Sequence, residues 1–98
     1  MDTRQQKNAV VSSDEWYTPK WIIDELGPFD LDPCAPMEPP YPIAPLSYNK
    51  KQDGLAHDWP STAVVWMNPP YSRAPLRQFV EKMAKHGRGI ALLVNRQG

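Results

Sequence analysis

The tetrapeptide Asn68-Pro69-Pro70-Tyr71 combines the residue types of this sequence that are best suited to chemistry. The side-chain carbonyl of Asn68 and the backbone carbonyl of Pro69 are hydrogen-bond acceptors, and the two prolines fix φ and so stiffen the loop. Two acceptors placed against the N–H groups of an exocyclic amine help to localise its lone pair, which is otherwise delocalised into the ring. Tyr71 adds a flat face on which such a ring can stack, contributing roughly 1–3 kcal/mol. The tetrapeptide therefore indicates group transfer to an amine of a heteroaromatic ring.

The segments on either side of the tetrapeptide predict a strand before it and a helix after it. Residues 63–67 are a continuous apolar run of strand length, which is typical of a strand buried on both faces. Ser72 is placed to cap a helix that runs to His86, with Gly87 just past its end, and residues 90–94 repeat the buried-strand pattern. An apolar stripe at helical spacing is formed by Leu76, Phe79, Val80 and Met83. The order strand, helix, strand predicts a parallel sheet and an α/β fold.

A short helix is predicted near the start of the chain. Thr18 and Pro19 have the pattern of an N-cap followed by a proline in the first helical turn, and Gly27 is placed to end the helix. Its apolar face is expected to consist of Ile22, Ile23 and Leu26.

A second strand end is predicted at Asp32-Pro33, because residues 29–31 alternate between apolar and polar side chains. Ligands of open parallel sheets bind beyond the carboxyl ends of the strands. Asp32 and Asn68 both follow such an end, so we expect them to share one edge of the sheet. Residues 36–45 hold five prolines and are expected to form a loop, and residues 49–54 a turn.

The composition indicates one small domain. The chain has 98 residues, of which 41% are hydrophobic, with twelve prolines and zero net charge. Residues 1–71 hold five Lys/Arg and ten Asp/Glu, whereas residues 72–98 hold six Lys/Arg and one Glu. The basic part either meets phosphate or is the solvated face of a helix. Core or loop-packing roles are expected for Trp16, Trp21, Trp59 and Trp66.

The single cysteine, Cys34, excludes an intrachain disulfide and a Cys-rich metal site. His57 and His86 are isolated and lack metal-ligand spacing, so no metal is expected. The polar first residues do not resemble a signal peptide, and no apolar run approaches membrane-spanning length. We therefore expect a cytoplasmic protein without a membrane partner.

Four segments together resemble a known family. Asn-Pro-Pro-Tyr after a buried strand is similar to the catalytic motif of Rossmann-like amino methyltransferases. Residues 15–19 resemble the Trp-x-Thr-Pro segment of phage and prophage DNA adenine-N6 methyltransferases, and residues 29–35 resemble their cofactor segment. Asp53-Gly54-Leu55, followed by Trp59, resembles their acidic turn. The four segments occur in the order of that family and extend over residues 14 to about 95.

The resemblance implies an incomplete Rossmann-like S-adenosylmethionine methyltransferase fold with a parallel sheet and a Pro-rich loop. Residues 1–13 would be a flexible N-terminal segment and residues 14–98 a partial methyltransferase domain, acting on DNA in a bacterial or phage-infected cell. The cofactor would be bound by Thr18 and Pro19 at its methionine end, by Asp32 at its cationic group with Pro33 shaping the turn, and by Asp53 near adenosine. The target base would be held by Asn68, Pro69, Pro70 and Tyr71.

Two features depart from the pattern. Cys34-Ala35 stand where many Rossmann-like methyltransferases have a Gly-rich loop. The sequence also stops at Gly98, just after a predicted buried strand, which would leave an apolar sheet edge unpaired. A truncated reading frame, a fragment, or a homodimer that covers this edge would each account for it.

Other functions remain open at this point. A protein glutamine-N5 methyltransferase uses the same tetrapeptide, but it normally has the glycine-rich loop and lacks the Trp-x-Thr-Pro segment. Cytosine-N4 methylation more often has Ser in the first position, and RNA is a further substrate. A noncatalytic remnant that binds cofactor or nucleic acid would fit the early stop. The PxxP spacings at residues 36–39 and 42–45 would fit a proline-rich interaction module.

Overall fold

The computed structural model describes residues 17–93, which form an α/β arrangement with a four-stranded parallel sheet. The strand order in the sheet is β3-β2-β4-β5. The elements in chain order are α1 (Lys20–Leu26), β2 (Leu31–Asp32), β3 (Leu46–Ser47), the 3₁₀ turn η1 (Gly54–Ala56), β4 (Val65–Met67), α2 (Arg73–His86) and β5 (Gly89–Ala91). The predicted α/β class and parallel sheet are confirmed.

The predicted βαβ unit is β4, α2 and β5. β5 pairs with β4 in parallel, with Val65 opposite Gly89 and Met67 opposite Ala91. Ser72 occupies the N-cap position of α2, although its side chain makes no capping hydrogen bond. Gly87 ends the helix in the left-handed conformation with φ of 74°, which costs a residue without Cβ little. The prediction of this unit is confirmed at both ends of the helix.

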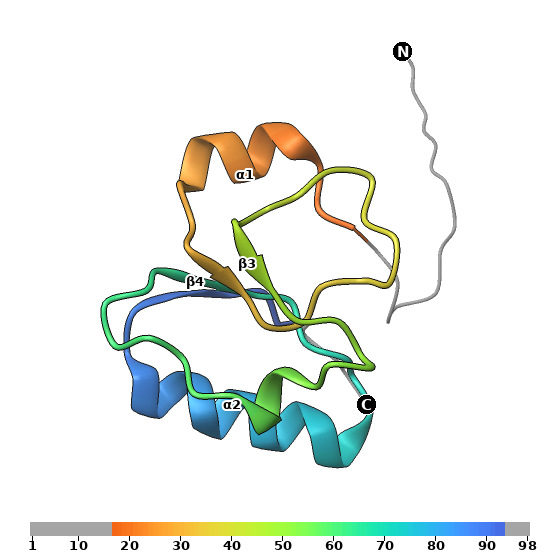
Figure 1. The fold of residues 1–98 in the computed structure, drawn as a ribbon, viewed down its shortest axis with the longest axis vertical. Coiled ribbons are helices and arrows are strands. Elements are labelled where there is room, and N and C mark those ends of the chain that lie inside the picture. The colour runs from red at the N-terminus through yellow and green to blue at the C-terminus, as the bar shows by residue number, and fades with distance from the viewer. Residues whose placement is uncertain (1–16, 94–98) are drawn as a thin grey trace.

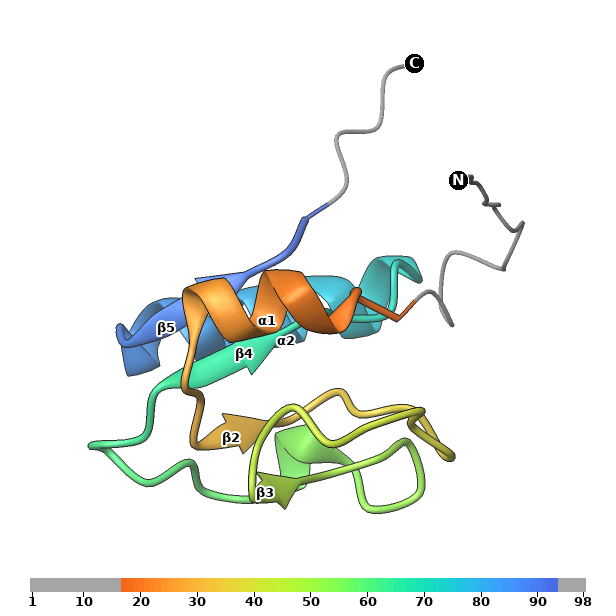
Figure 2. The same cartoon turned by 90° about the horizontal axis from the view of Figure 1, so that it is seen from above.

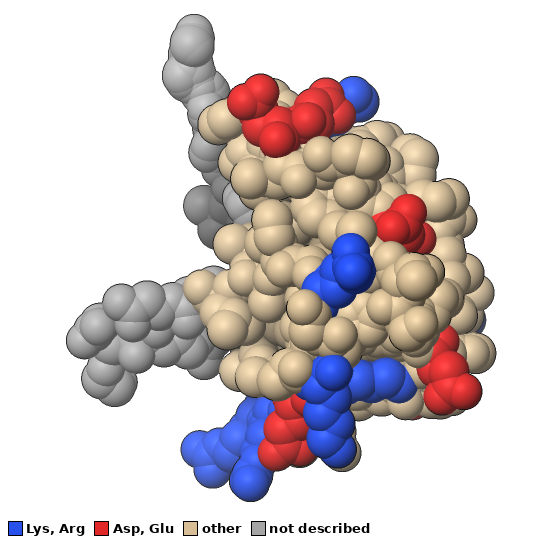
Figure 3. Space-filling view, turned by 90° about the vertical axis from the view of Figure 1, so that its left-hand side faces the viewer, with Lys and Arg blue, Asp and Glu red and all other residues tan. Residues whose placement is uncertain are grey.

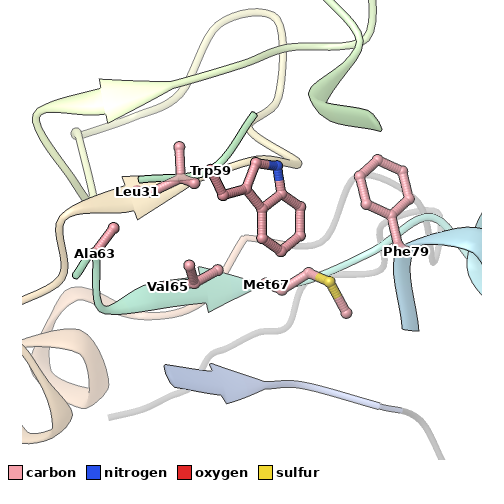
Figure 4. Packing of buried hydrophobic residues seen from close by; sticks show 6 residues of the cluster. All are labelled: Leu31, Trp59, Ala63, Val65, Met67 and Phe79. Atoms are coloured by element: carbon pink, nitrogen blue, oxygen red, sulfur yellow. The ribbon is translucent and has the colours of Figure 1, made fainter. Parts of the chain in front are cut away.

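The two helices lie on opposite faces of the sheet (Figures 1 and 2). Side chains alternate between the two faces of a strand, so β4 contributes to both cores. Val65 and Met67 belong to the core that faces α2, whereas Trp66 belongs to the core that faces α1. In Figure 4, Phe79 extends from α2 toward Trp59 in the first of these cores. All three β4 residues are buried, as the apolar run predicted.

Several predictions for the first helix are wrong. Pro19, and not Thr18, occupies the N-cap position of α1, and no side chain caps the helix. Thr18 is instead turned into the protein, where 2% of it is exposed. Leu26 is 48% exposed, so it does not belong to the buried face, and Trp21 is 68% exposed and is not a core residue. A helix of two turns has one buried stripe, which Ile23 fills.

Two strands differ from expectation. β3 was not predicted: it consists of Leu46 and Ser47, both exposed, and it forms because these residues pair with Leu31 and Asp32 of β2. β5 is only partly buried, because it lies at an edge of the described sheet. The Pro-rich residues 36–45 contain no helix or strand, as predicted. The expected flexible segment 1–13, the Trp16 position and the last residue of the predicted strand 90–94 lie outside the described residues.

Within the part of the chain that the structure describes, no helix has the length and apolar character needed to cross a membrane.

Candidate functional site

The carboxyl ends of neighbouring strands bring the predicted site segments to one edge of the sheet. Figure 2 shows β2, β3 and β4 running in the same direction. Leu31 of β2 pairs with Val65 of β4, and Asp32 and Asn68 come one and three residues after this pair. The loop that follows Asp32 and the tetrapeptide that begins at Asn68 therefore leave adjacent strands at the same edge.

Tyr71 connects the tetrapeptide to Leu92, the residue that follows β5. Its hydroxyl lies 2.8 Å from the carbonyl oxygen of Leu92 and 3.3 Å from Oδ1 of Asn68. A phenol has one proton to donate, and the shorter contact to Leu92 is the stronger of the two. Tyr71 is 9% exposed and Pro69 is fully buried, so the side chains of both residues pack against the interior of the protein. The amide oxygen of Asn68 has two lone pairs, so it can accept hydrogen bonds from more than one donor.

The Asp32 carboxyl group is buried at this edge. Only 3% of the residue is exposed, and its Oδ1 accepts a hydrogen bond of 3.2 Å from the backbone N–H of Cys34. Burial raises the pKa of Asp32 to about 7, although the Cys34 N–H opposes this rise. Among residues 17–93 no Lys or Arg forms an ion pair with this carboxyl group. A buried carboxylate without a cation is costly, so this position suits a ligand that supplies positive charge.

Thr18 has a buried hydroxyl group without a hydrogen-bond partner among the described residues. A buried hydroxyl normally finds a partner, and its absence costs about 1–3 kcal/mol. The neighbouring Tyr17 lies close enough to Asp32 for the carboxylate charge to raise the pKa of its phenol, in addition to the larger effect of burial. The Thr18 segment and Asp32 thus face the same region, whereas Pro19 is exposed.

Cys34 is not suited to act as a nucleophile. Burial, and then the nearby Asp32 charge, raise the pKa of its thiol, so the reactive thiolate is disfavoured.

The Asp53-Gly54 turn packs directly on the loop that follows β2. Asp53 has φ of 61°, and its Oδ1 accepts a 3.1 Å hydrogen bond from the backbone N–H of Leu55. A Cβ added to Gly54 would lie 2.1 Å from the carbonyl oxygen of Pro33, so only glycine allows this approach. The indole N–H of Trp59 donates to the Gly54 carbonyl at 2.9 Å. The exposed Asp53 side chain is therefore carried on a turn fixed beside Asp32-Pro33.

Three residues that hold these loops were not found from the sequence. Lys82 of α2 donates from Nζ to the carbonyl oxygens of Leu55 at 3.1 Å and of His57, which ties the turn to the helix. Tyr17 and Tyr41 join the Thr18 segment to the Pro-rich loop through hydroxyl–carbonyl hydrogen bonds. Tyr17 lies within the Trp-x-Thr-Pro segment, but no local pattern indicates its partner.

The polar groups at this edge suit a ligand that has a cationic part and a polar part. The Asp32 carboxylate can face a cationic group, and the Thr18 hydroxyl can bond a polar one. No cluster of three His, Cys, Asp or Glu side chains within residues 17–93 could hold a metal ion. The arrangement thus combines a place for a cationic ligand with two rigid acceptors on the next strand.

Charge is separated across the molecule. In Figure 3 acidic side chains gather at the α1 end and basic side chains at the α2 end. α1 carries Asp24 and Glu25, and the basic residues of α2 and the turn after it are Arg73, Arg77, Lys82, Lys85 and Arg88. Arg77 is paired with Glu81 at 3.3 Å and Lys82 with backbone carbonyls. Arg73, at the first position of α2, lies two residues after Tyr71.

Comparison with known proteins agrees with the resemblance seen in the sequence. The DNA N-6-adenine-methyltransferase (Dam) family profile matches residues 5–98. The "DNA N-6-adenine-methyltransferase" of Escherichia phage T1 is 32% identical over 87 residues, which is 83% of this chain and 35% of that protein. The chain thus spans about a third of the length of this relative. No solved structure matches. With nearly its whole length matched by the family profile, the chain belongs to the DNA N-6-adenine-methyltransferase (Dam) family.

Proposed function

We propose that this protein transfers a methyl group from S-adenosylmethionine to the N6 amine of adenine in DNA. Membership of the Dam family supports the reaction class. The observation that carries the proposal is the position of two groups on adjacent strands: the buried Asp32 carboxyl group stands on the last residue of β2, and the acceptors of Asn68 and Pro69 follow β4.

Asn68 and Pro69 activate the amine in this proposal. The Asn68 Oδ1 and the Pro69 carbonyl oxygen accept the two N–H groups of adenine N6, and so favour the geometry in which the nitrogen lone pair is available. The positive charge that grows on the nitrogen during transfer strengthens both hydrogen bonds. Because Pro69 is fully buried and both prolines fix φ, little reorganisation is needed during the reaction.

Asp32, Thr18 and Asp53 bind the methyl donor. S-adenosylmethionine supplies a sulfonium-bound methyl group and a cationic amino-acid end. The Asp32 carboxylate faces that positive charge, Thr18 offers its buried hydroxyl to the methionine end with Pro19 beside it, and Asp53 lies toward the adenosine end. Pro33, against which Gly54 packs, keeps the two parts of this site together.

DNA is the proposed partner of the tetrapeptide and the α2 surface. The target adenine leaves the duplex, Pro70 shapes the entry to the pocket, and the Tyr71 ring lines it. Arg73 lies directly after this loop and is exposed, so it can meet a phosphate next to the flipped nucleotide. In this proposal residues 14–98 belong to a Rossmann-like methyltransferase domain that acts in the cytoplasm of a bacterial or phage-infected cell.

The test is a methylation assay with nucleoside analysis. The full chain is incubated with methyl-labelled S-adenosylmethionine and unmethylated duplex DNA, and the DNA is then digested to nucleosides. We expect the label in N6-methyldeoxyadenosine for the wild type and for Gln78→Ala, which removes an exposed carboxamide from α2. Asn68→Ala should give no labelled nucleoside.

Three results would contradict the proposal. Label in N4-methyldeoxycytidine would change the target base. Label on protein would indicate a glutamine-N5 methyltransferase. Cofactor binding with no transfer to any acceptor would indicate a noncatalytic protein.

A further inference from the structure

Two tyrosines connect the Pro-rich loop to the segment that precedes α1. The Tyr17 hydroxyl donates a hydrogen bond to the carbonyl oxygen of Tyr41, and the Tyr41 hydroxyl donates one to the carbonyl oxygen of Thr18. The two rings meet edge to face, with centroids 4.9 Å apart and planes at 69°. We refer to Tyr17 and Tyr41, joined in this way, as the tyrosine clasp.

The clasp restrains the backbone on both sides of the Thr18 side chain. Tyr17 is the preceding residue, and the Thr18 carbonyl oxygen is the acceptor of the Tyr41 hydroxyl. Thr18 does not cap α1, because Pro19 occupies the N-cap position and no side chain bonds the helix end. The α1 helix therefore does not explain why the Thr18 side chain is buried. The clasp supplies the missing restraint.

The Thr18 hydroxyl is held in an unfavourable state. The residue is 2% exposed, and its hydroxyl oxygen has no hydrogen-bond partner within residues 17–93. If the Thr18 backbone were free to rotate, the hydroxyl could reach water or the N-terminal end of α1. Fixing a buried donor in advance is useful when a ligand later bonds to it, since less order must then be created on binding.

The clasp also lies near the Asp32 carboxyl group of the site. The charge of the Asp32 carboxylate contributes to the raised pKa of the Tyr17 phenol, after the larger effect of burial. Asp32 itself is 3% exposed. Tyr41 belongs to the loop that follows the Asp32 turn in the sequence and is half-buried. The clasp thus connects the Pro-rich loop, the Thr18 segment and the region of Asp32.

We propose that Tyr17 and Tyr41 are positioning residues of the methyl-donor site, which hold the buried Thr18 hydroxyl in the orientation that bonds the polar end of S-adenosylmethionine. This inference rests on the proposed function. In this inference the Pro-rich loop does not contact the cofactor. Through Tyr41 it holds Thr18, which does. Tyr41 acts only through Thr18, so its contribution to cofactor binding depends on the Thr18 hydroxyl.

A double-mutant cycle on cofactor binding tests this dependence. The Kd of the full chain for S-adenosylmethionine is measured by calorimetry for the wild type, Tyr41→Phe, Thr18→Val and the double variant. Tyr41→Phe and Thr18→Val each remove a hydroxyl with little change of shape, and each should raise Kd about fivefold. The double variant should match Thr18→Val within about twofold. Gln78→Ala, which changes an exposed residue of α2, should keep the wild-type Kd.

The outcomes separate the inference from the proposed function. A wild type that does not bind S-adenosylmethionine overturns both. If the wild type binds S-adenosylmethionine, the Kd of the double variant decides the positioning role. Two independent fivefold effects would raise this Kd about 25-fold, and that result would overturn the positioning role alone. An unchanged Kd for Tyr41→Phe overturns it as well. The same cycle with Tyr17→Phe gives an independent measurement that keeps the Tyr41 ring and its hydroxyl in place.

Discussion

Replacing Asp32 with asparagine should stabilise the ligand-free protein at high pH. Burial raises the pKa of Asp32 from 3.8 to about 7, so the folded protein binds this proton more tightly than the unfolded chain does. The residue's contribution to stability is therefore greatest below about pH 4 and is lost as the pH rises through about 7. Each tenfold change in proton affinity corresponds to about 1.4 kcal/mol, so the loss is of the order of 4 kcal/mol. An asparagine at this position would not ionise, and its amide oxygen could still accept from the Cys34 N–H.

Urea denaturation followed by circular dichroism at pH 5, 6, 7 and 8 measures this difference. The free energy of unfolding of Asp32→Asn, relative to wild type, should increase from pH 5 to about pH 7 and level off above it. Gln78→Ala is the control, because it changes an exposed side chain that does not ionise, so its stability relative to wild type should not depend on pH. Two results would refute the view that burial destabilises the charged form of Asp32. One is a difference in unfolding free energy that does not depend on pH. The other is a wild type that becomes more stable relative to Asp32→Asn as the pH rises.

Three further perturbations follow from the packing of the site. Gly54→Ala should destabilise the fold by at least about 2 kcal/mol in urea denaturation, because its Cβ would lie 2.1 Å from the Pro33 carbonyl oxygen. Lys82→Met should cost about 1–2 kcal/mol and raise the Kd for S-adenosylmethionine, because the hydrogen bond to the Leu55 carbonyl at 3.1 Å is lost, whereas Lys82→Arg should recover part of both. Arg73→Ala should reduce the slope of log K for DNA against log salt by about one, measured by fluorescence anisotropy, with cofactor affinity unchanged.

Local sequence patterns were sufficient for the βαβ unit. A continuous apolar run identified β4, and Gly87 marked the end of α2 because its left-handed conformation favours glycine. They were not sufficient for β3, whose two exposed residues carry no periodic pattern and form a strand only by pairing with β2. The prediction that Thr18 caps α1 was wrong for a related reason. Thr-Pro is a common helix start, but contacts with Tyr41, 23 residues further on, place Thr18 inside the protein instead.

The candidate site could be located, but its supports could not. Asp32 and Asn68 each follow a predicted strand, and parallel strands bring their carboxyl ends to one edge, so their neighbourhood follows from topology. The clasp and the Lys82 contacts depend on side chains that meet across long sequence separations, 24 residues for Tyr17 and 27 for Lys82 with Leu55. No periodicity reports such contacts. The same is true of the raised pKa of Asp32, which depends on what covers the carboxyl group.

The most direct measurement of the central claim is the single-turnover rate of methyl transfer for wild type and Asn68→Ala, with Kd for S-adenosylmethionine determined in parallel. If Asn68 acts on the target amine, the rate should fall by at least about 100-fold while the Kd for the cofactor stays within about twofold of wild type. An Asn68→Ala protein that transfers the methyl group at the wild-type rate would contradict the account, as would one whose loss of rate is explained entirely by weaker cofactor binding.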